Sequence, residues 1–277
     1  MSYYKNSKNR KSKEDEVPWI PLFLVVLVVF LLIIFFAKNY LSKQSQLENI
    51  DKETFCNIDK IEQLTIFVID TSDKLTPIQQ TSLNEKLWNY VKNINRNNHQ
   101  IQVFSVDKIN EKILEPIIKI CNPGDEKEVN SWTGNKKITR LNFETKFKEK
   151  IDKIFTDLLN KEASDKSPIM ESVQSVAVSQ LIKNENNETK FKIILISDLL
   201  QNSENFSFYK GDFNFNKFYK SDNFRFLKAD FKNAEIELYF LNRKKDINLQ
   251  NESLRDFWIK YFQEQNATVT RFLPIEG

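Results

Sequence analysis

Apolar and polar positions divide this chain into one long hydrophobic stretch and a region where short apolar runs alternate with helical patterns. Residues 19–37 carry no charged side chain. Nineteen residues of α-helix extend about 28 Å, close to the hydrocarbon thickness of a bilayer. The pattern predicts a transmembrane helix over 18–40, between a basic and polar N-terminal tail (1–17) and a linker (41–62).

A cleaved signal peptide is the alternative, because five cations precede the apolar stretch as they would in such a peptide. The stretch is long for a signal peptide, and Ala37-Lys38-Asn39 matches a cleavage site poorly. A permanent anchor is therefore favoured. The five cations before the span outnumber the three just after it, which predicts a cytoplasmic N-terminus in the inner (plasma) membrane. The following domain would then be extracytoplasmic, and periplasmic in a bacterial cell.

Residues 63–277 are expected to form one domain of alternating strands and helices. Continuous apolar runs at 64–69, 191–196 and 235–241 are typical of strands buried on both faces of a sheet. Further strands are expected at 100–106, 115–121 and 268–272, and helices at 77–95, 143–159, 169–182, 224–231 and 254–265. This order predicts an α/β fold with a doubly wound, mostly parallel, six-stranded Rossmann-like sheet and helices on both faces.

Composition argues against several classes of function. The net charge of +3 comes from scattered cations, which does not favour nucleic acid, and four glycines leave no phosphate-binding loop. His99 is the only histidine, and its polar surroundings predict a solvated turn residue. We therefore do not expect an enzyme. Cys56 and Cys121 predict a disulfide in an oxidising compartment, with two reduced, buried thiols as the alternative.

Oxygen-bearing side chains follow the two strongest predicted strands. Asp70 and Ser72 come after the first, Asp198 follows the strand at 191–196, and Ser167 precedes a helix. In parallel sheets, ligands bind beyond the carboxyl ends of the strands. Carboxylates and hydroxyls at this edge are the ligands of a hard divalent cation such as Mg²⁺. Alternatively, Asp70, Ser72 and Ser167 cap helices and Asp198 binds loop amides.

Four segments carry a resemblance to a known family: 68–76 (VIDTSDKLT), 167–171 (SPIME), 196–203 (ISDLLQNS) and 255–258 (RDFW). Together with the element order they resemble the von Willebrand factor A (vWA) domain, in bacterial, membrane-anchored members of poorly defined role. The resemblance implies a metal-ion-dependent adhesion site in which Asp70, Ser72, Ser167 and Asp198 are ligands. Lys74 stands where the family has a second serine, so its ammonium could replace the metal as a built-in counter-ion.

Nine aromatic residues lie between positions 206 and 226, directly after the second oxygen-bearing loop. Large rings beside a binding site suit a protein interface, and five of them are candidate partner-binding residues: Phe206, Phe208, Tyr209, Phe213 and Phe215. Burial in the core is the alternative. Stacking on single-stranded nucleic acid fits the ring pattern but not the expected location outside the cytoplasm.

The expected function is therefore a membrane-anchored, vWA-like docking or scaffold component of an envelope complex, which binds another protein through a divalent-metal site. A metal-free structural subunit with a degenerate site is the first alternative. A metal-dependent envelope hydrolase that uses Asp70 and Asp198 is the second.

Overall fold

The computed structural model describes residues 19–94, 98–106, 114–124, 135–161, 164, 166–182 and 188–277. The chain divides between Glu48 and Asn49 into two compact units. The first contains α1 (Trp19–Glu48), and its segment Phe23–Leu41 is long and apolar enough to cross a membrane. No other helix of the described residues meets that criterion.

The second unit is built on a six-stranded sheet with the order β3-β2-β1-β4-β5-β6. Its strands are β1 (Gln63–Ile69), β2 (His99–Ser105), β3 (Ile118–Cys121), β4 (Lys190–Ser197), β5 (Ala234–Leu241) and β6 (Ala267–Ile275). All neighbours pair in parallel except β2 and β3, which are antiparallel. The predicted mixed fold with a mostly parallel sheet is confirmed.

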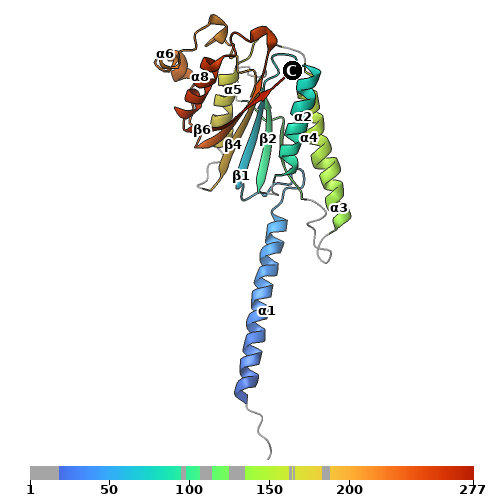
Figure 1. Ribbon diagram of the computed structural model, residues 1–277. Coiled ribbons are helices and arrows are strands. Elements are labelled where there is room, and N and C mark those ends of the chain that lie inside the picture. Colours follow the sequence, from blue (N-terminus) through green and yellow to red (C-terminus); the bar gives the residue numbers. More distant parts are fainter. Residues whose placement is uncertain are drawn as a thin grey trace, which may run out of the picture. The chain divides into compact units, whose positions relative to one another are not determined.

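Helices lie on both faces of this sheet (Figure 1). One face carries α2 (Pro77–Lys92) and α4 (Glu149–Leu159), and the other carries α5 (Ile169–Val176) and α8 (Glu252–Gln263). Successive residues of β1 alternate between two separate cores, with Ile66 and Val68 in one and Phe67 and Ile69 in the other. Burial of each such side chain stabilises the fold by about 1.5–3 kcal/mol.

The remaining elements connect these layers. They are α3 (Lys136–Leu141), the π-helical segments η3 (Asn142–Lys148) and η4 (Ala177–Leu181), the 3-10 turns η5 (Phe208–Lys210) and η6 (Lys244–Asp246), α6 (Phe215–Tyr219) and α7 (Asp222–Leu227). The helix expected at 143–159 therefore begins earlier and contains a π-helical segment. The helix expected at 224–231 begins at Asp222 and ends at Leu227.

Two predictions near the start of the domain have different outcomes. Cys56 and Cys121 form a disulfide, as predicted. The prediction that His99 is a solvated turn residue is wrong, because His99 is the first residue of β2 and only 7% exposed. Its Nε2 lies 2.8 Å from Thr65 Oγ1 on β1. Burial, and secondarily the charge of Lys192, lowers the pKa of His99 to about 4.

Candidate functional site

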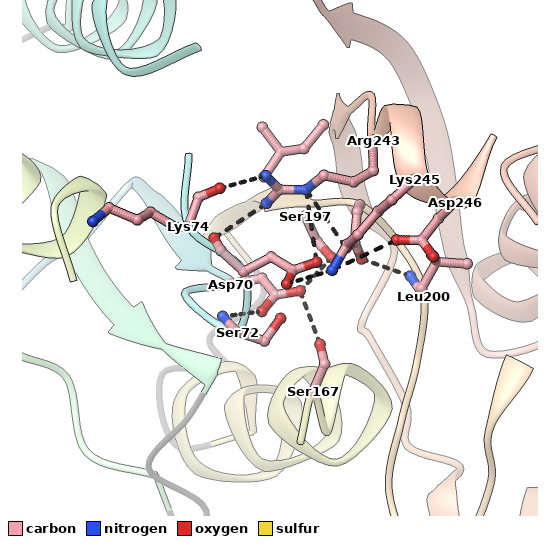
Figure 2. Close-up of polar contacts among 12 residues, drawn as sticks. Asp70, Ser72, Lys74, Ser167, Ser197, Leu200, Arg243, Lys245 and Asp246 are labelled. Atoms are coloured by element: carbon pink, nitrogen blue, oxygen red, sulfur yellow. Dashed lines mark hydrogen bonds and ion pairs between the residues drawn. The ribbon is translucent and has the colours of Figure 1, made fainter. Parts of the chain in front are cut away.

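Asp70 is the centre of a hydrogen-bonded cluster at the carboxyl edge of the sheet (Figure 2). The residue is 4% exposed, and its Oδ1 accepts a hydrogen bond from the backbone N–H of Ser72 at 3.0 Å. Oδ2 accepts one from Ser167 Oγ at 2.9 Å and one from Ser197 Oγ at 2.7 Å. Three segments that lie far apart in the sequence therefore meet at one carboxylate.

Ser197 is a member of this cluster that sequence reasoning missed. It is the last residue of β4 and is fully buried, and its Oγ also accepts a hydrogen bond from the backbone N–H of Leu199 at 2.8 Å. The signal that could have found it is its position directly before Asp198 at the carboxyl end of a central strand.

Asp198 follows β4 and is held by an unusual turn. Leu199 has a φ of 62°, a left-handed conformation that is unfavourable for a leucine. The indole N–H of Trp258 donates to Leu199 O at 2.9 Å and fixes this conformation. As a result, the backbone N–H of Leu200 reaches Asp198 Oδ1 at 2.9 Å. Backbone strain held by surrounding contacts is common at functional sites.

Asp198 is poorly compensated electrostatically. The residue is 3% exposed, and burial together with the nearby charge of Asp70 raises the pKa of the Asp198 carboxyl group well above its ordinary value. The N–H of Leu200 and the guanidinium of Arg243 each lower the pKa of Asp198, but the net change is still an increase. Two close, buried carboxyl groups therefore favour a nearby positive charge.

Arg243, in the loop after β5, supplies part of that charge. Its side chain is 8% exposed, and Nε lies 3.7 Å from Asp198 Oδ2 and 4.0 Å from Asp73 Oδ2. Its terminal nitrogens donate to the backbone carbonyls of Lys74 at 2.9 Å and Asp73 at 3.2 Å. Nε itself is buried and has no hydrogen-bond partner among the residues that the structure describes. A second cation, Lys245, pairs with Asp73 Oδ1 at 2.9 Å.

These contacts correct the expectation for Lys74. The Lys74 side chain is exposed and points away from the Asp70 carboxylate (Figure 2). The counter-ion of the buried acids is Arg243, which lies 45 residues beyond Asp198 in the sequence. The prediction of a built-in counter-ion named Lys74, whereas the cation next to Asp198 is Arg243.

Helix capping does not account for the cluster. Thr76 caps α2 in a capping box with Gln79, so Asp70 and Ser72 are not the caps of that helix. The N-cap position of α5 is Pro168, which forms no side-chain cap, and the Ser167 hydroxyl donates to Asp70 instead. The alternative interpretation also expected Asp198 to bind loop amides, and this part is observed, because the N–H of Leu200 donates to Asp198 Oδ1.

A polar pocket of about 250 Å³ opens beside the cluster. Its lining includes Ser72, Ser167, Asp198, Tyr209 and Lys245. Tyr209 is 47% exposed, and burial of its hydroxyl together with the charge of Asp198 raises the pKa of Tyr209. With Asp73 and Lys166, which also line it, the pocket offers hydroxyl groups, two acids and two ammonium groups to a ligand.

The other candidate partner-binding rings belong mainly to the core. Phe208 is fully buried and Phe215 is 7% exposed, while Phe206 and Phe213 are partly buried against the same core. The Phe206, Phe208 and Phe215 rings contact the Phe257 ring at centroid distances of 5.8, 4.9 and 5.3 Å. The interface prediction therefore does not hold for Phe208 and Phe215, which are buried and contact Phe257 of α8, whereas for the partly buried Phe206 and Phe213 it stays a prediction. Tyr209 alone combines exposure with a position at the pocket.

The donor set suits a hard cation. Oxygen ligands about 2.1 Å from an octahedral Mg²⁺ lie about 3 Å from each other, and Ser167 Oγ lies 2.9 Å from Asp70 Oδ2. Asp70 and Asp198 contribute the charge. The described residues contain no cluster of three or more His, Cys, Asp or Glu side chains arranged to hold a metal. Hydroxyl groups would therefore have to complete such a site.

Comparisons with known proteins leave the family open. No protein-family model matches the chain, and no curated protein matches it. One similar solved structure is that of proximal thread matrix protein 1 from the mussel byssus, at 12% identity over 70% of this chain and a TM-score of 0.38. This chain spans 42% of that protein's length. The likeness is too low to carry an argument about function.

Proposed function

We propose that this chain is a membrane-anchored docking protein whose vWA-like domain binds a partner protein at the pocket beside Asp70 and Asp198. The observation that carries the proposal is the convergence of donors from Ser72, Ser167 and Ser197 on the buried Asp70 carboxylate. The carboxyl group of Asp198, whose pKa is raised by burial and by the charge of Asp70, lies next to it. The sheet order, with β1 at its centre and helices on both faces, supports a doubly wound domain of the vWA type.

A divalent cation such as Mg²⁺ is the ligand that this donor set suits best. Asp70, Ser72, Ser167 and Asp198 would hold it, and the bound cation would supply a positive centre that attracts a carboxylate of the partner. The bound cation would stabilise the ionised form of Asp198 most, because its positive charge would offset the like charge of Asp70. Tyr209 and Lys245 would contact the partner around that centre.

The second candidate is a metal-free docking site, in a structural subunit of an envelope complex. Arg243 favours it, because a guanidinium 3.7 Å from Asp198 Oδ2 already neutralises part of the charge that a metal would neutralise. In that case Arg243 and Lys245 fix the shape of the rim, and the partner binds without a metal.

The proposed location follows from α1 and the disulfide. The apolar segment Phe23–Leu41 supports a single membrane span, and the excess of cations before it supports a cytoplasmic N-terminus. The Cys56–Cys121 disulfide supports an extracytoplasmic domain, since disulfides persist mainly in oxidising compartments. A cysteine-accessibility assay on intact cells, with a reporter cysteine at exposed Ser253, would contradict this orientation if the residue reacted only after permeabilisation.

Calorimetric titration of the detergent-solubilised chain with Mn²⁺ tests the metal. We expect saturable binding by the wild type, at least tenfold weaker binding by Asp198→Asn, and wild-type binding by Asp256→Asn, which changes an exposed acid on α8. Absence of binding by the wild type and by Arg243→Met would exclude the metal.

Co-purification from membranes, with and without chelator, tests the docking role. Loss of the same partner in chelator and in Asp198→Asn supports the metal-dependent site. Loss in Arg243→Met but not in chelator supports the metal-free site. The docking proposal fails if partner recovery is unchanged in Asp198→Asn, Arg243→Met and Tyr209→Ala.

A further inference from the structure

β6 is an edge strand with an open side. Within the described residues it pairs with β5 only, and it stands at the end of the sheet order. Its nine residues extend about 30 Å, with Thr268, Thr270, Arg271 and Pro274 exposed. An edge strand presents unpaired backbone N–H and C=O groups to an incoming strand.

A groove flanks β6 on each face of the sheet. The larger one, about 770 Å³, lies between β6 and α2 and is lined by Tyr90, Tyr239, Arg271 and Leu273. The smaller one, about 390 Å³, lies on the α8 side. Its lining includes Phe240, Glu252, Arg255, Phe272 and Pro274. Of the β6 residues, Arg271 and Leu273 line the larger groove only, Pro274 lines the smaller one only, and Phe272 borders both.

The charges around this edge favour an acidic occupant. The larger groove is lined by Lys86 and by no acidic side chain, whereas the smaller one has both Arg255 and Glu252 in its lining. Neither Lys86 nor Arg255 forms an ion pair with a described acid. Arg271 is 59% exposed at its side chain and lies 3.8 Å from Glu237. The Arg255 guanidinium lies 4.8 Å from the Phe272 ring, which makes a platform that is both aromatic and cationic.

A second copy of this chain fits the edge poorly. Arg271 is the central residue of β6, so antiparallel pairing of two full β6 strands would place two arginines directly opposite each other. Like charges in that position are destabilising. The register shift between β5 and β6 at Ile236/Glu237 leaves Thr270 as an extra residue, and such bulges protect edges from pairing with identical edges.

We propose that β6 binds an extended, acidic peptide segment of another protein as an added strand. Backbone hydrogen bonds to β6 supply affinity, and the alternate side chains of the peptide enter the two grooves and supply specificity. Acidic side chains pair with Arg271 and Lys86 on one face, and an apolar or aromatic side chain packs on Phe240 and Phe272 on the other. This site is independent of the pocket at Asp198.

The test uses the full chain in detergent and a phage-displayed library of random twelve-residue peptides. We expect enriched peptides to contain acidic residues, and their synthetic forms to bind in a fluorescence polarisation assay. Arg271→Glu and Lys86→Glu should each weaken binding at least tenfold. Lys260→Glu, which reverses an exposed charge on α8 that lines neither groove, should bind as the wild type does, and so should Asp198→Asn.

A separate experiment tests whether the peptide backbone forms hydrogen bonds with β6. Methylation of alternate peptide nitrogens should abolish binding in one of the two registers only, because only every second N–H of the peptide would face β6. Hydrogen exchange should slow in residues 268–273 when peptide is added. Equal affinity for the wild type and Arg271→Glu, equal tolerance of methylation in both registers, or dimerisation through β6 in sedimentation analysis would each overturn the proposal.

Discussion

Replacement of Arg243 by methionine is the most direct probe of the buried charge cluster. The substitution keeps an apolar stem of similar length but removes the guanidinium. It leaves Asp198 without its cation and leaves the carbonyls of Asp73 and Lys74 without their donors. Both losses fall on a site that is almost entirely buried.

The magnitude follows from the contacts. At 3.7 Å and an effective dielectric constant of about 20, the Arg243–Asp198 attraction is about 4.5 kcal/mol. Each hydrogen bond from a charged donor adds about 1.5–3 kcal/mol. Burial of the guanidinium offsets much of this sum, and removal of one member of a buried ion pair typically costs about 3–5 kcal/mol. We therefore expect Arg243→Met to lower the free energy of unfolding by about 4 kcal/mol.

A double-mutant cycle isolates the pair. Asp198→Asn removes the uncompensated charge, so we expect the Asp198→Asn/Arg243→Met protein to be destabilised by at least about 1 kcal/mol less than the sum of the two single variants. The assay is urea denaturation of the solubilised chain in the presence of chelator, so that metal does not contribute. Lys244→Met, at an exposed neighbouring position, is the control and should change stability by less than about 0.5 kcal/mol.

Two results would refute this account of the cluster. If Arg243→Met unfolds within about 1 kcal/mol of the wild type, the guanidinium does not compensate the acids. If the double variant loses the full sum of the single effects, Arg243 and Asp198 act independently despite their 3.7 Å separation.

Three further predictions concern other parts of the domain. The pKa of His99 is lowered from 6.5 to about 4, so the unfolded state binds more protons between these values, and stability should fall by about 3 kcal/mol as pH falls from about 6.5 to 4. His99→Gln should flatten that dependence in denaturation curves at several pH values. Replacement of both Cys56 and Cys121 by alanine should cost about 4 kcal/mol, from the 65-residue separation that the disulfide closes, and an unchanged melting temperature would contradict this. Phe208→Ala should cost about 3–5 kcal/mol by leaving a cavity against Phe257, whereas Tyr209→Ala should cost less than about 1 kcal/mol; equal melting temperatures would refute this contrast.

The amino-acid sequence by itself determined the local elements of this protein. The apolar run at 64–69 gave a buried central strand because six consecutive apolar and branched residues suit a strand covered on both faces. The spacing of apolar residues likewise predicted a helix over 77–95, and α2 occupies Pro77–Lys92 of that range. These signals are local, since they depend on the period of each element and on the residues at its ends.

Part of the candidate site could also be predicted from local patterns in the sequence. Asp70 and Asp198 each follow a predicted central strand, and strands of a parallel sheet end at a common edge, so their proximity could be inferred without coordinates. Ser167 could be included because a proline after it marks the start of a helix. Ser197 was missed because its one signal in the sequence is its position directly before Asp198, and its hydrogen bond to Asp70 depends on the pairing of β4 with β1.

Only the tertiary structure decided which side chains compensate the buried acids and which rings are covered. Lys74 is close to Asp70 in sequence, yet its side chain is exposed, whereas Arg243 reaches Asp198 because β5 lies next to β4 in the sheet. Phe208 and Phe215 are buried because α8 packs over them, and His99 is buried because β2 pairs with β1. Burial and charge compensation depend on contacts between distant segments, and a pattern read along the chain does not contain those contacts.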